Sequence, residues 1–120
     1  MKIALTAADN TGLEAKVDPR FGRASYFGIV DLELMEVEFI DNSAANASSG
    51  AGIQAAQLLS DQEIETLISV KVGPKAFDAL QSAGIDIYTV DGGKLKEVVE
   101  LYKNENLNKL DNPTNPGHMG

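Results

Sequence analysis

Short apolar runs alternate with helical patterns through the second half of the chain, and this alternation constrains the fold more than any other feature. Helix, strand, helix, strand and helix patterns follow one another over residues 53–60, 66–72, 75–83, 85–90 and 94–103. Pro74 stands in the first turn of the second helix, and Gly84 follows its end, where a left-handed cap is expected. Such alternation predicts parallel strands joined by right-handed crossovers, with helices covering the faces of the sheet.

The first half of the chain supplies three more strand patterns. They cover residues 2–7, 26–32 and 36–41, and the second and third predict a hairpin that turns near residues 33–35. A consistent arrangement places the first strand centrally, the hairpin to one side and the two later strands to the other. We therefore predict an α/β fold with a five-stranded mixed sheet in the order 3-2-1-4-5, in which only the second strand runs antiparallel.

The composition is that of one globular domain without a membrane span. The chain has 120 residues, of which 43% are hydrophobic and 23% charged, and these values are ordinary for such a domain. No apolar run approaches the roughly 18 residues that a membrane span needs, and the first residues already form a strand pattern, so we expect a cytoplasmic protein. Residues 104–120 are poor in hydrophobic side chains and predict a flexible C-terminal tail after a domain at residues 1–103.

The cysteine and histidine content excludes several kinds of site. The chain has no cysteine, and its one histidine, His118, lies in the predicted tail. Disulfides, thiolate-ligated clusters, a multi-histidine metal site within one chain and Cys-His or Ser-His-Asp catalysis are therefore excluded. The net charge of -8 disfavours nucleic acid and anionic membranes as partners. Any anion that the protein binds must be held by a local positive pocket.

Both arginines of this acidic chain lie in one loop at residues 8–25, called the Arg loop below. They are Arg20 and Arg23, and Lys16 stands just upstream. Guanidinium groups present forked, planar donors that suit phosphates, carboxylates and thioanions, so the loop predicts an anion site. The alternative is a solvated surface loop in which the arginines pair with nearby carboxylates. The carboxylates within reach are those of Asp18, Asp31 and Asp41.

The predicted strand order brings three loops to one rim of the sheet. The loops after the first, third and fourth strands emerge at the carboxyl ends, where open α/β sheets bind ligands. Two of them lead into helix N-termini, at about residues 51 and 74, whose free amides favour anions. The small-residue loop at 42–52 has a flexible connector as its alternative. The candidate binding residues are Arg20, Phe21, Gly22, Arg23, Ser49, Gly50, Ala51, Gly52, Gly73, Pro74 and Lys75, with Lys16 and Lys71 as further cations.

Three motifs, in this order, resemble the dinitrogenase iron-molybdenum cofactor biosynthesis family, which includes NifX-like and NifB-associated domains. The motifs are RFGRA at residues 20–24 followed by YF at 26–27, GAGIQAA at 50–56, and VGPKAFDAL at 72–80 running on to AGI at 83–85. The resemblance covers roughly residues 2–103. It implies a three-layer α/β/α domain with ribonuclease-H-like topology, in agreement with the predicted strand order. It also implies a protein that binds or carries a molybdenum- or iron-containing sulfur cluster.

A small stand-alone subgroup of this family, which includes the orange protein, is associated with a molybdenum-copper sulfide cluster held without covalent bonds. That subgroup suits a chain without cysteine. Many family members have histidine where Arg20 stands, and some have cysteine or histidine in the loop that corresponds to residues 42–52, whereas this sequence has neither. Our leading prediction is a non-enzymatic carrier that holds an anionic metal-sulfur cluster through Arg20, Arg23 and backbone amides. Remote ligand candidates are Met35, Met119 and His118.

Two alternatives come from other functional classes. The first is a protein-interaction or regulatory module without a bound cluster, which acts on an ATPase or on cofactor-assembly proteins. The second is a ribonuclease-H-type nuclease, which would need several carboxylates around two metal ions, near Asp9 and Asp41. A shared fold does not carry function across, and the negative net charge argues against a nuclease.

Overall fold

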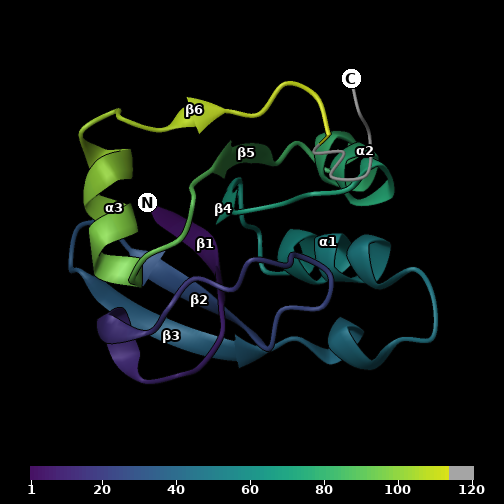
Figure 1. Cartoon of the computed structure of the whole chain (residues 1–120), viewed down its shortest axis with the longest axis horizontal. Coiled ribbons are helices and arrows are strands. Elements are labelled where there is room, and N and C mark those ends of the chain that lie inside the picture. Colours follow the sequence, from purple (N-terminus) through teal and green to yellow (C-terminus); the bar gives the residue numbers. More distant parts are fainter. Residues whose placement is uncertain (114–120) are drawn as a thin grey trace.

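The computed structural model describes residues 1–113, which form six strands, three α-helices and two short 3-10 helices (Figure 1). The strands are β1 (Lys2–Ala7), β2 (Tyr26–Asp31), β3 (Glu36–Asp41), β4 (Thr66–Ser69), β5 (Asp86–Thr89) and β6 (Asn108–Lys109). The α-helices are α1 (Ala51–Asp61), α2 (Pro74–Ser82) and α3 (Leu95–Lys103), and the 3-10 helices are η1 (Gly12–Glu14) and η2 (Ser43–Asn46). Within this part of the chain, no helix has the length and apolar character that a membrane crossing needs.

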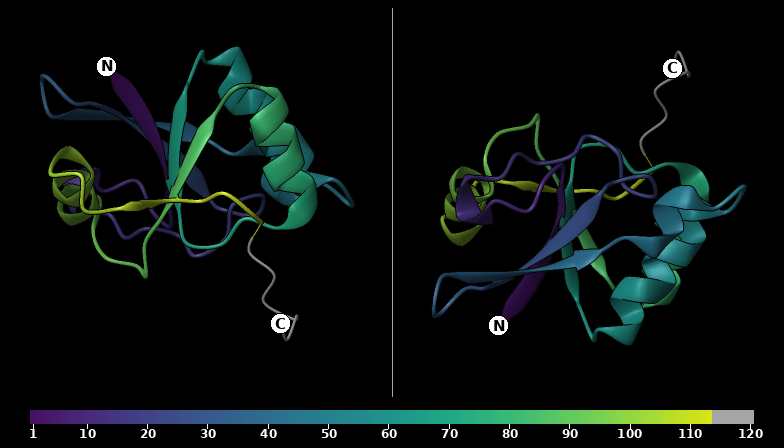
Figure 2. Two further views of the ribbon diagram at one scale, coloured as in Figure 1. Left: turned by 90° about the horizontal axis from the view of Figure 1, so that it is seen from above. Right: turned by 90° about the horizontal axis from the view of Figure 1, so that it is seen from below.

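Helices lie on both faces of the sheet and enclose two hydrophobic cores. Figure 2 shows α1 and α2 together on one face and α3 on the other. Along β1, Ala4 joins the core under α1 and α2, whereas its neighbours Ile3 and Leu5 join the core under α3. A strand buried on both faces requires this alternation. Full burial of a side chain such as Leu5 contributes about 1.5–3 kcal/mol, so the two cores hold the three layers together.

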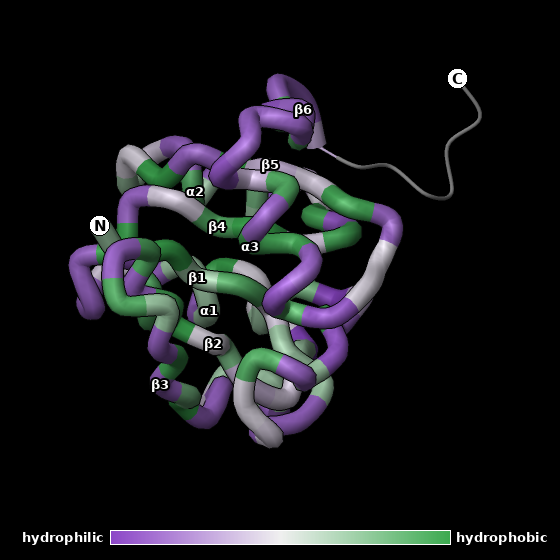
Figure 3. Tube along the Cα trace, turned by 90° about the vertical axis from the view of Figure 1, so that its left-hand side faces the viewer, coloured by the Kyte–Doolittle hydropathy of each residue, from purple (hydrophilic) through white to green (hydrophobic). Residues whose placement is uncertain are grey.

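The sheet order is β3-β2-β1-β4-β5-β6, which confirms the order predicted for the first five strands. β1 pairs in parallel with β4, and β4 with β5, while β2 runs antiparallel to both of its neighbours. The predicted number of five strands was wrong, because β6 pairs antiparallel with β5 and extends the sheet to six. β6 is hydrophilic (Figure 3), so no apolar run in the sequence marked it as a strand.

β6 comes from the stretch predicted as the tail, and three contacts hold it. The amide of Leu110 donates to the carbonyl of Ile87 at 2.7 Å, and the Leu110 side chain packs against the core under α1 and α2. At the surface, the Lys109 ammonium lies 3.1 Å from the Asp86 carboxylate. Residues 114–120, which include His118 and Met119, lie outside the described residues.

The proline and glycine residues that were predicted to bound α2 lie at its two ends. α2 begins at Pro74, and Gly84 has a φ of +76°, the left-handed conformation expected of its cap. α1 begins at Ala51, directly after Gly50, which has a φ of +71°. β4 is shorter than predicted, since it ends at Ser69, where its partner β5 also ends.

Candidate functional site

Three loops meet at the carboxyl ends of β1, β3 and β4. These strands point in the same direction, so the Arg loop and the loops at 42–50 and 70–73 emerge at one rim, as predicted. The Arg loop folds back onto the strand that precedes it. The amide of Asp18 donates to the carbonyl of Thr6 at 3.0 Å, and the Thr6 hydroxyl donates to the carbonyl of Asp18 at 2.7 Å. The loop is therefore fixed to the end of β1 just before its arginines.

Arg20 forms a doubly hydrogen-bonded pair with Asp18. Its Nε donates to Oδ1 and its Nη2 to Oδ2, both at 3.1 Å, and its backbone amide donates to Oδ1 at 2.9 Å. The Asp18 side chain is 2% exposed, whereas the Arg20 side chain is 60% exposed. For Arg20, the alternative that an arginine of this loop pairs with a nearby carboxylate is therefore correct, and the partner is Asp18.

The ionised state of this pair follows from its contacts. Burial acts to raise the pKa of Asp18, but hydrogen bonds from Arg20, its charge and the Ser25 amide outweigh burial and hold that pKa below its ordinary value. In return, the hydrogen bonds and charge of Asp18 raise the pKa of Arg20. Both groups stay charged, so the Arg20 guanidinium is committed to holding the turn at Pro19.

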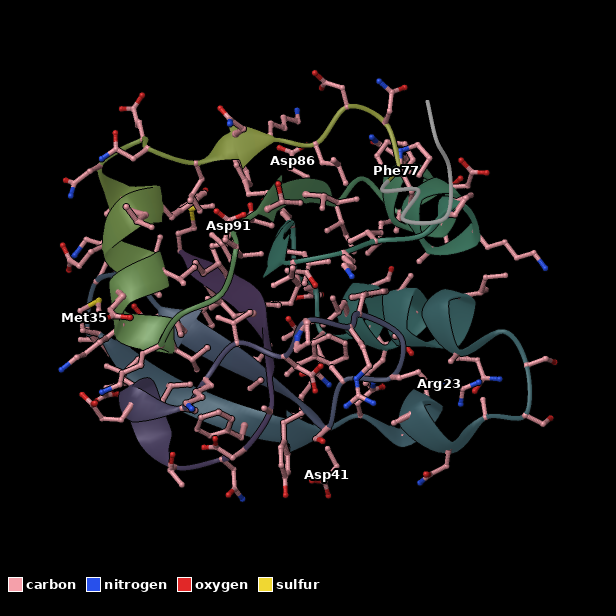
Figure 4. All side chains as sticks on the ribbon, viewed as in Figure 1. Arg23, Met35, Asp41, Phe77, Asp86 and Asp91 are labelled. Carbon is pink, nitrogen blue, oxygen red and sulfur yellow. The ribbon has the colours of Figure 1, made fainter. Side chains whose placement is uncertain are left out.

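Arg23 reaches in the opposite direction and joins the Arg loop to the loop after β3. Its Nη1 donates to the carbonyl oxygens of Ala45 at 2.9 Å and of Ala47 at 2.6 Å. Figure 4 shows the Arg23 side chain beside η2 and α1. Its Nε and Nη2 have no partner within residues 1–113. Arg23 therefore has donors left for a ligand, which distinguishes it from Arg20.

Asn42 makes the reciprocal connection from the start of the second loop. Its Nδ2 donates to the carbonyl oxygens of Gly22 at 3.0 Å and Ala24 at 2.9 Å, and its Oδ1 accepts from the amide of Ala44 at 3.1 Å. The residue is 4% exposed. The small-residue loop is thus tied to the Arg loop at its first residue, which the flexible-connector alternative does not predict.

Two glycines bring the Arg loop, α1 and α2 into close contact. A Cβ atom at Gly22 would lie 2.6 Å from the backbone nitrogen of Gly52, and one at Gly52 would lie 2.8 Å from the Cβ of Ala76. Neither position has room for a side chain. The first turn of α1 is therefore held between the Arg loop and the first turn of α2, and both helix N-termini face one hollow.

This hollow, called the rim pocket below, has a volume of about 510 Å³. Every predicted binding residue lines it except Arg20 and Ser49. Lys71 also lines it, whereas Lys16 does not: its backbone forms an isolated antiparallel β-bridge with Lys94. The lining residues are Phe21, Gly22, Arg23, Gly50, Ala51, Gly52, Ile53, Lys71, Gly73, Pro74, Lys75 and Ala76.

The rim pocket is positively charged. Arg23, Lys71 and Lys75 are exposed, and its lining contains no carboxylate. Lys71 and Lys75 form no ion pair within the part of the chain that is described, unlike Lys94, which pairs with Glu14. No side chain caps the first turn of α1 or of α2, so their amides are available to an anion.

The side chains of the described residues do not form a metal centre. Over residues 1–113, no group of three or more His, Cys, Asp or Glu side chains could hold a metal ion. The described residues thus lack the carboxylate cluster that the nuclease alternative requires near Asp9 and Asp41. Met35 lies in the hairpin turn, at the opposite end of the molecule from Arg23 (Figure 4), and packs against the core under α3. The other remote candidates, His118 and Met119, lie outside the described residues.

A larger hollow, of about 660 Å³, has a different chemistry. It lies beside α3, where the rings of Tyr88 and Tyr102 pack edge to face with centroids 5.2 Å apart. Its one lysine, Lys103, is matched by Glu105, so it carries no net positive charge. Size alone would favour this hollow, but the charges and free amides that suit an anion are in the rim pocket.

Comparison with known proteins identifies the family. Residues 1–105 match the family model described as dinitrogenase iron-molybdenum cofactor. The chain belongs to this family. The apo orange protein from Desulfovibrio gigas has the same fold, with a TM-score of 0.90, 40% identity and coverage of 95% of this chain and 96% of that one. The resemblance inferred from the three sequence motifs is confirmed.

Two further relatives of this iron-molybdenum cofactor family member cover nearly its whole length. A putative NifB protein from Thermotoga, described as belonging to the DUF35 family, is 34% identical over 97% of this chain and 98% of its own, with a TM-score of 0.82. An uncharacterized protein from Methanocaldococcus jannaschii is 32% identical over 114 residues, which are 92% of each chain.

In this member of the family, sequence reasoning named Asp18 as a possible partner of the arginines but missed the turns that Asp18 and Asn42 hold. Each is an Asx residue whose side-chain oxygen accepts the amide two residues ahead, from Arg20 and from Ala44. An Asp or Asn followed by a turn is a signal for this motif. No local sequence pattern predicts the additional hydrogen bonds from Asn42 to the Arg loop, because they join residues about twenty positions apart.

Proposed function

We propose that this protein binds and carries an anionic metal-sulfur cluster, held in the rim pocket without covalent bonds. The cluster is cargo and contains molybdenum with copper or iron. One observation carries the proposal: Arg23, Lys71 and Lys75 surround the same hollow as two uncapped helix N-termini. The family and the 40% identity to the orange protein support a cofactor-handling role.

The chemistry of the pocket suits a thiometallate. Such an anion presents sulfur atoms that accept hydrogen bonds, and the pocket offers ammonium, guanidinium and amide donors around about 510 Å³. The chain has no cysteine, so the sulfur must come with the cargo. Exposed Ile53 and the Pro74 ring add apolar contacts at the same wall. These groups fit a preformed cluster and do not fit a cluster ligated by protein thiolates.

The proposed binding residues divide into two roles. Lys71 and Lys75 hold the charge of the cargo, together with the free donors of Arg23 and the amides after Gly50 and Gly73. Arg20 positions the Arg loop through Asp18, and that carboxylate balances its charge outside the pocket lining. Ser49 precedes Gly50, the residue that caps α1, and is expected to help position the first turn of that helix.

The proposal is tested by mixing the purified chain with tetrathiomolybdate, with and without copper, followed by gel filtration, elemental analysis and a visible spectrum. We expect stoichiometric molybdenum and charge-transfer bands to elute with the protein. Lys71→Ala combined with Lys75→Ala should weaken binding by about tenfold or more per lysine, because each removes a charged hydrogen-bond donor.

A matched control separates the pocket from the overall charge. Lys2→Ala combined with Lys103→Ala removes the same charge from outside the rim pocket and should leave binding nearly unchanged. Equal losses in the two double variants would contradict the site assignment. Elution of the unmodified chain without metal would contradict the carrier function and favour the protein-interaction alternative.

A further inference from the structure

The outer side of β3 presents unpaired backbone groups. β3 is the last strand of the sheet on its side, below β2 in Figure 1, with η1 near it. The amide of Asn42 donates to the carbonyl of Ser25, which fixes the direction of the backbone groups along the strand. Because that direction alternates, Val37, Phe39 and Asp41 point their N–H and C=O groups away from β2. These groups have no hydrogen-bond partner among residues 1–113.

The two faces of this edge differ in chemistry. Val37 and Phe39 pack toward the core under α3, with the Phe39 ring against Tyr26 at a centroid distance of 6.4 Å. Glu36 and Glu38 lie on the opposite face and are exposed. Along residues 36–39, an added strand would therefore meet apolar side chains on one face and carboxylates on the other.

A hollow adjoins the acidic face. It has a volume of about 490 Å³, and it extends from Glu38 and Ile40 on β3 across the sheet to the turn after α1. Its three glutamates outnumber its two cationic groups, the side chain of Lys2 and the amino group of Met1, so its net charge is negative. The lining residues are Met1, Lys2, Ile29, Glu38, Ile40, Gln62, Glu63, Ile64 and Glu65.

We propose that the edge of β3 binds an extended segment of a partner protein in which basic and apolar residues alternate. The segment adds a seventh strand to the sheet and satisfies the outward groups of Val37, Phe39 and Asp41. Its lysine or arginine side chains lie across from Glu36 and Glu38, and its apolar side chains extend the row of Val37 and Phe39. This surface is separate from the rim pocket, so the inference does not depend on the proposed cargo.

Charge complementarity selects this occupant over a second copy of the chain. Two copies that paired antiparallel through β3 would bring Glu36 and Glu38 of both molecules onto one face of the joined sheet, and like charges close together across strands are destabilising. The net charge of -8 adds to that repulsion. A basic segment is instead attracted both by the two glutamates and by the negative net charge of the chain.

The test uses the isotopically labelled full chain and a synthetic peptide of four lysines alternating with three valines, with blocked ends. We expect the peptide to slow amide hydrogen exchange at Val37, Phe39 and Asp41, while the amides of Glu36 and Glu38, which already face β2, change less. A peptide with glutamate in place of lysine should have no effect.

Charge reversal supplies the matched variants. Glu36→Lys combined with Glu38→Lys should weaken binding of the lysine peptide by about tenfold or more and create binding of the glutamate peptide. Asp78→Lys combined with Glu100→Lys changes the same charge on α2 and α3 and should leave binding unchanged. Equal binding by both double variants, or exchange effects away from β3, would overturn the proposal. Slow exchange at Val37 and Phe39 in a chain that elutes as a dimer without peptide would assign the edge to a second copy instead.

Discussion

The contact between Gly22 and the first turn of α1 makes a quantitative prediction for Gly22→Ala. The new Cβ would lie 2.6 Å from the nitrogen and 2.8 Å from the Cα of Gly52, and 2.9 Å from the carbonyl carbon of Ala51. All three neighbours are backbone atoms, so no side-chain rotation relieves the contact. Since ordinary contacts begin at 3.4 Å, the Arg loop and α1 must separate by about 0.8 Å.

Overpacking of this kind costs about 1–3 kcal/mol, and a contact with backbone alone belongs in the upper half of that range. For a domain of this size, a loss of about 2–3 kcal/mol lowers the melting temperature by about 8–12 °C. Thermal unfolding followed by circular dichroism measures the shift, and urea unfolding measures the free energy.

Gly73→Ala is the matched control, because Gly73 caps α2 at the same pocket and a Cβ there meets no atom within 4 Å. It should cost about 1 kcal/mol or less, from the poorer capping preference of alanine. If Gly22→Ala were as stable as Gly73→Ala, the close approach of the Arg loop to α1 would be refuted.

Two further predictions concern the polar groups that hold the loops. Asn42→Ala leaves two carbonyls and one amide without their partner and should cost about 1–3 kcal/mol; an unchanged urea midpoint would contradict this. The pKa of Asp18 is lowered in the folded chain, so ionised Asp18 adds to the free energy of unfolding above its ordinary pKa of 3.8. This stabilisation is lost as the pH falls through the pKa of the folded state. The stability difference between the unmodified chain and Asp18→Asn should therefore narrow below about pH 4, and a difference that stayed constant in melts between pH 7 and pH 2 would exclude this role.

Sequence reasoning predicted the order of five strands because local signals agreed with one another. Pro74 and Gly84 bounded a helix between two apolar strands, and few topologies accommodate such a unit beside a hairpin. The meeting of the loops at one rim followed from strand direction alone. The rim pocket therefore contains most of the predicted residues, although they come from three stretches that lie far apart in the sequence.

The different positions of Arg20 and Arg23 could not be predicted, because the direction of a side chain in a loop depends on tertiary contacts. Both residues have the same charge and similar neighbours in the sequence. Arg20 turns back to a carboxylate two residues away, whereas Arg23 reaches Ala45 and Ala47 on another loop. β6 escaped prediction for a related reason: two polar residues have no periodicity, and pairing with β5 forms through backbone groups.

The unequal lengths of the two outermost strands limit how this sheet can grow. β3 has six residues, whereas β6 at the other boundary has two. If one molecule's β3 were to continue the sheet of the next, it would find only two residues with which to pair, too few to hold a head-to-tail stack. The short β6 therefore keeps copies of this chain from joining head to tail into an open-ended fibre, while β3 stays long enough to pair with a strand of another protein.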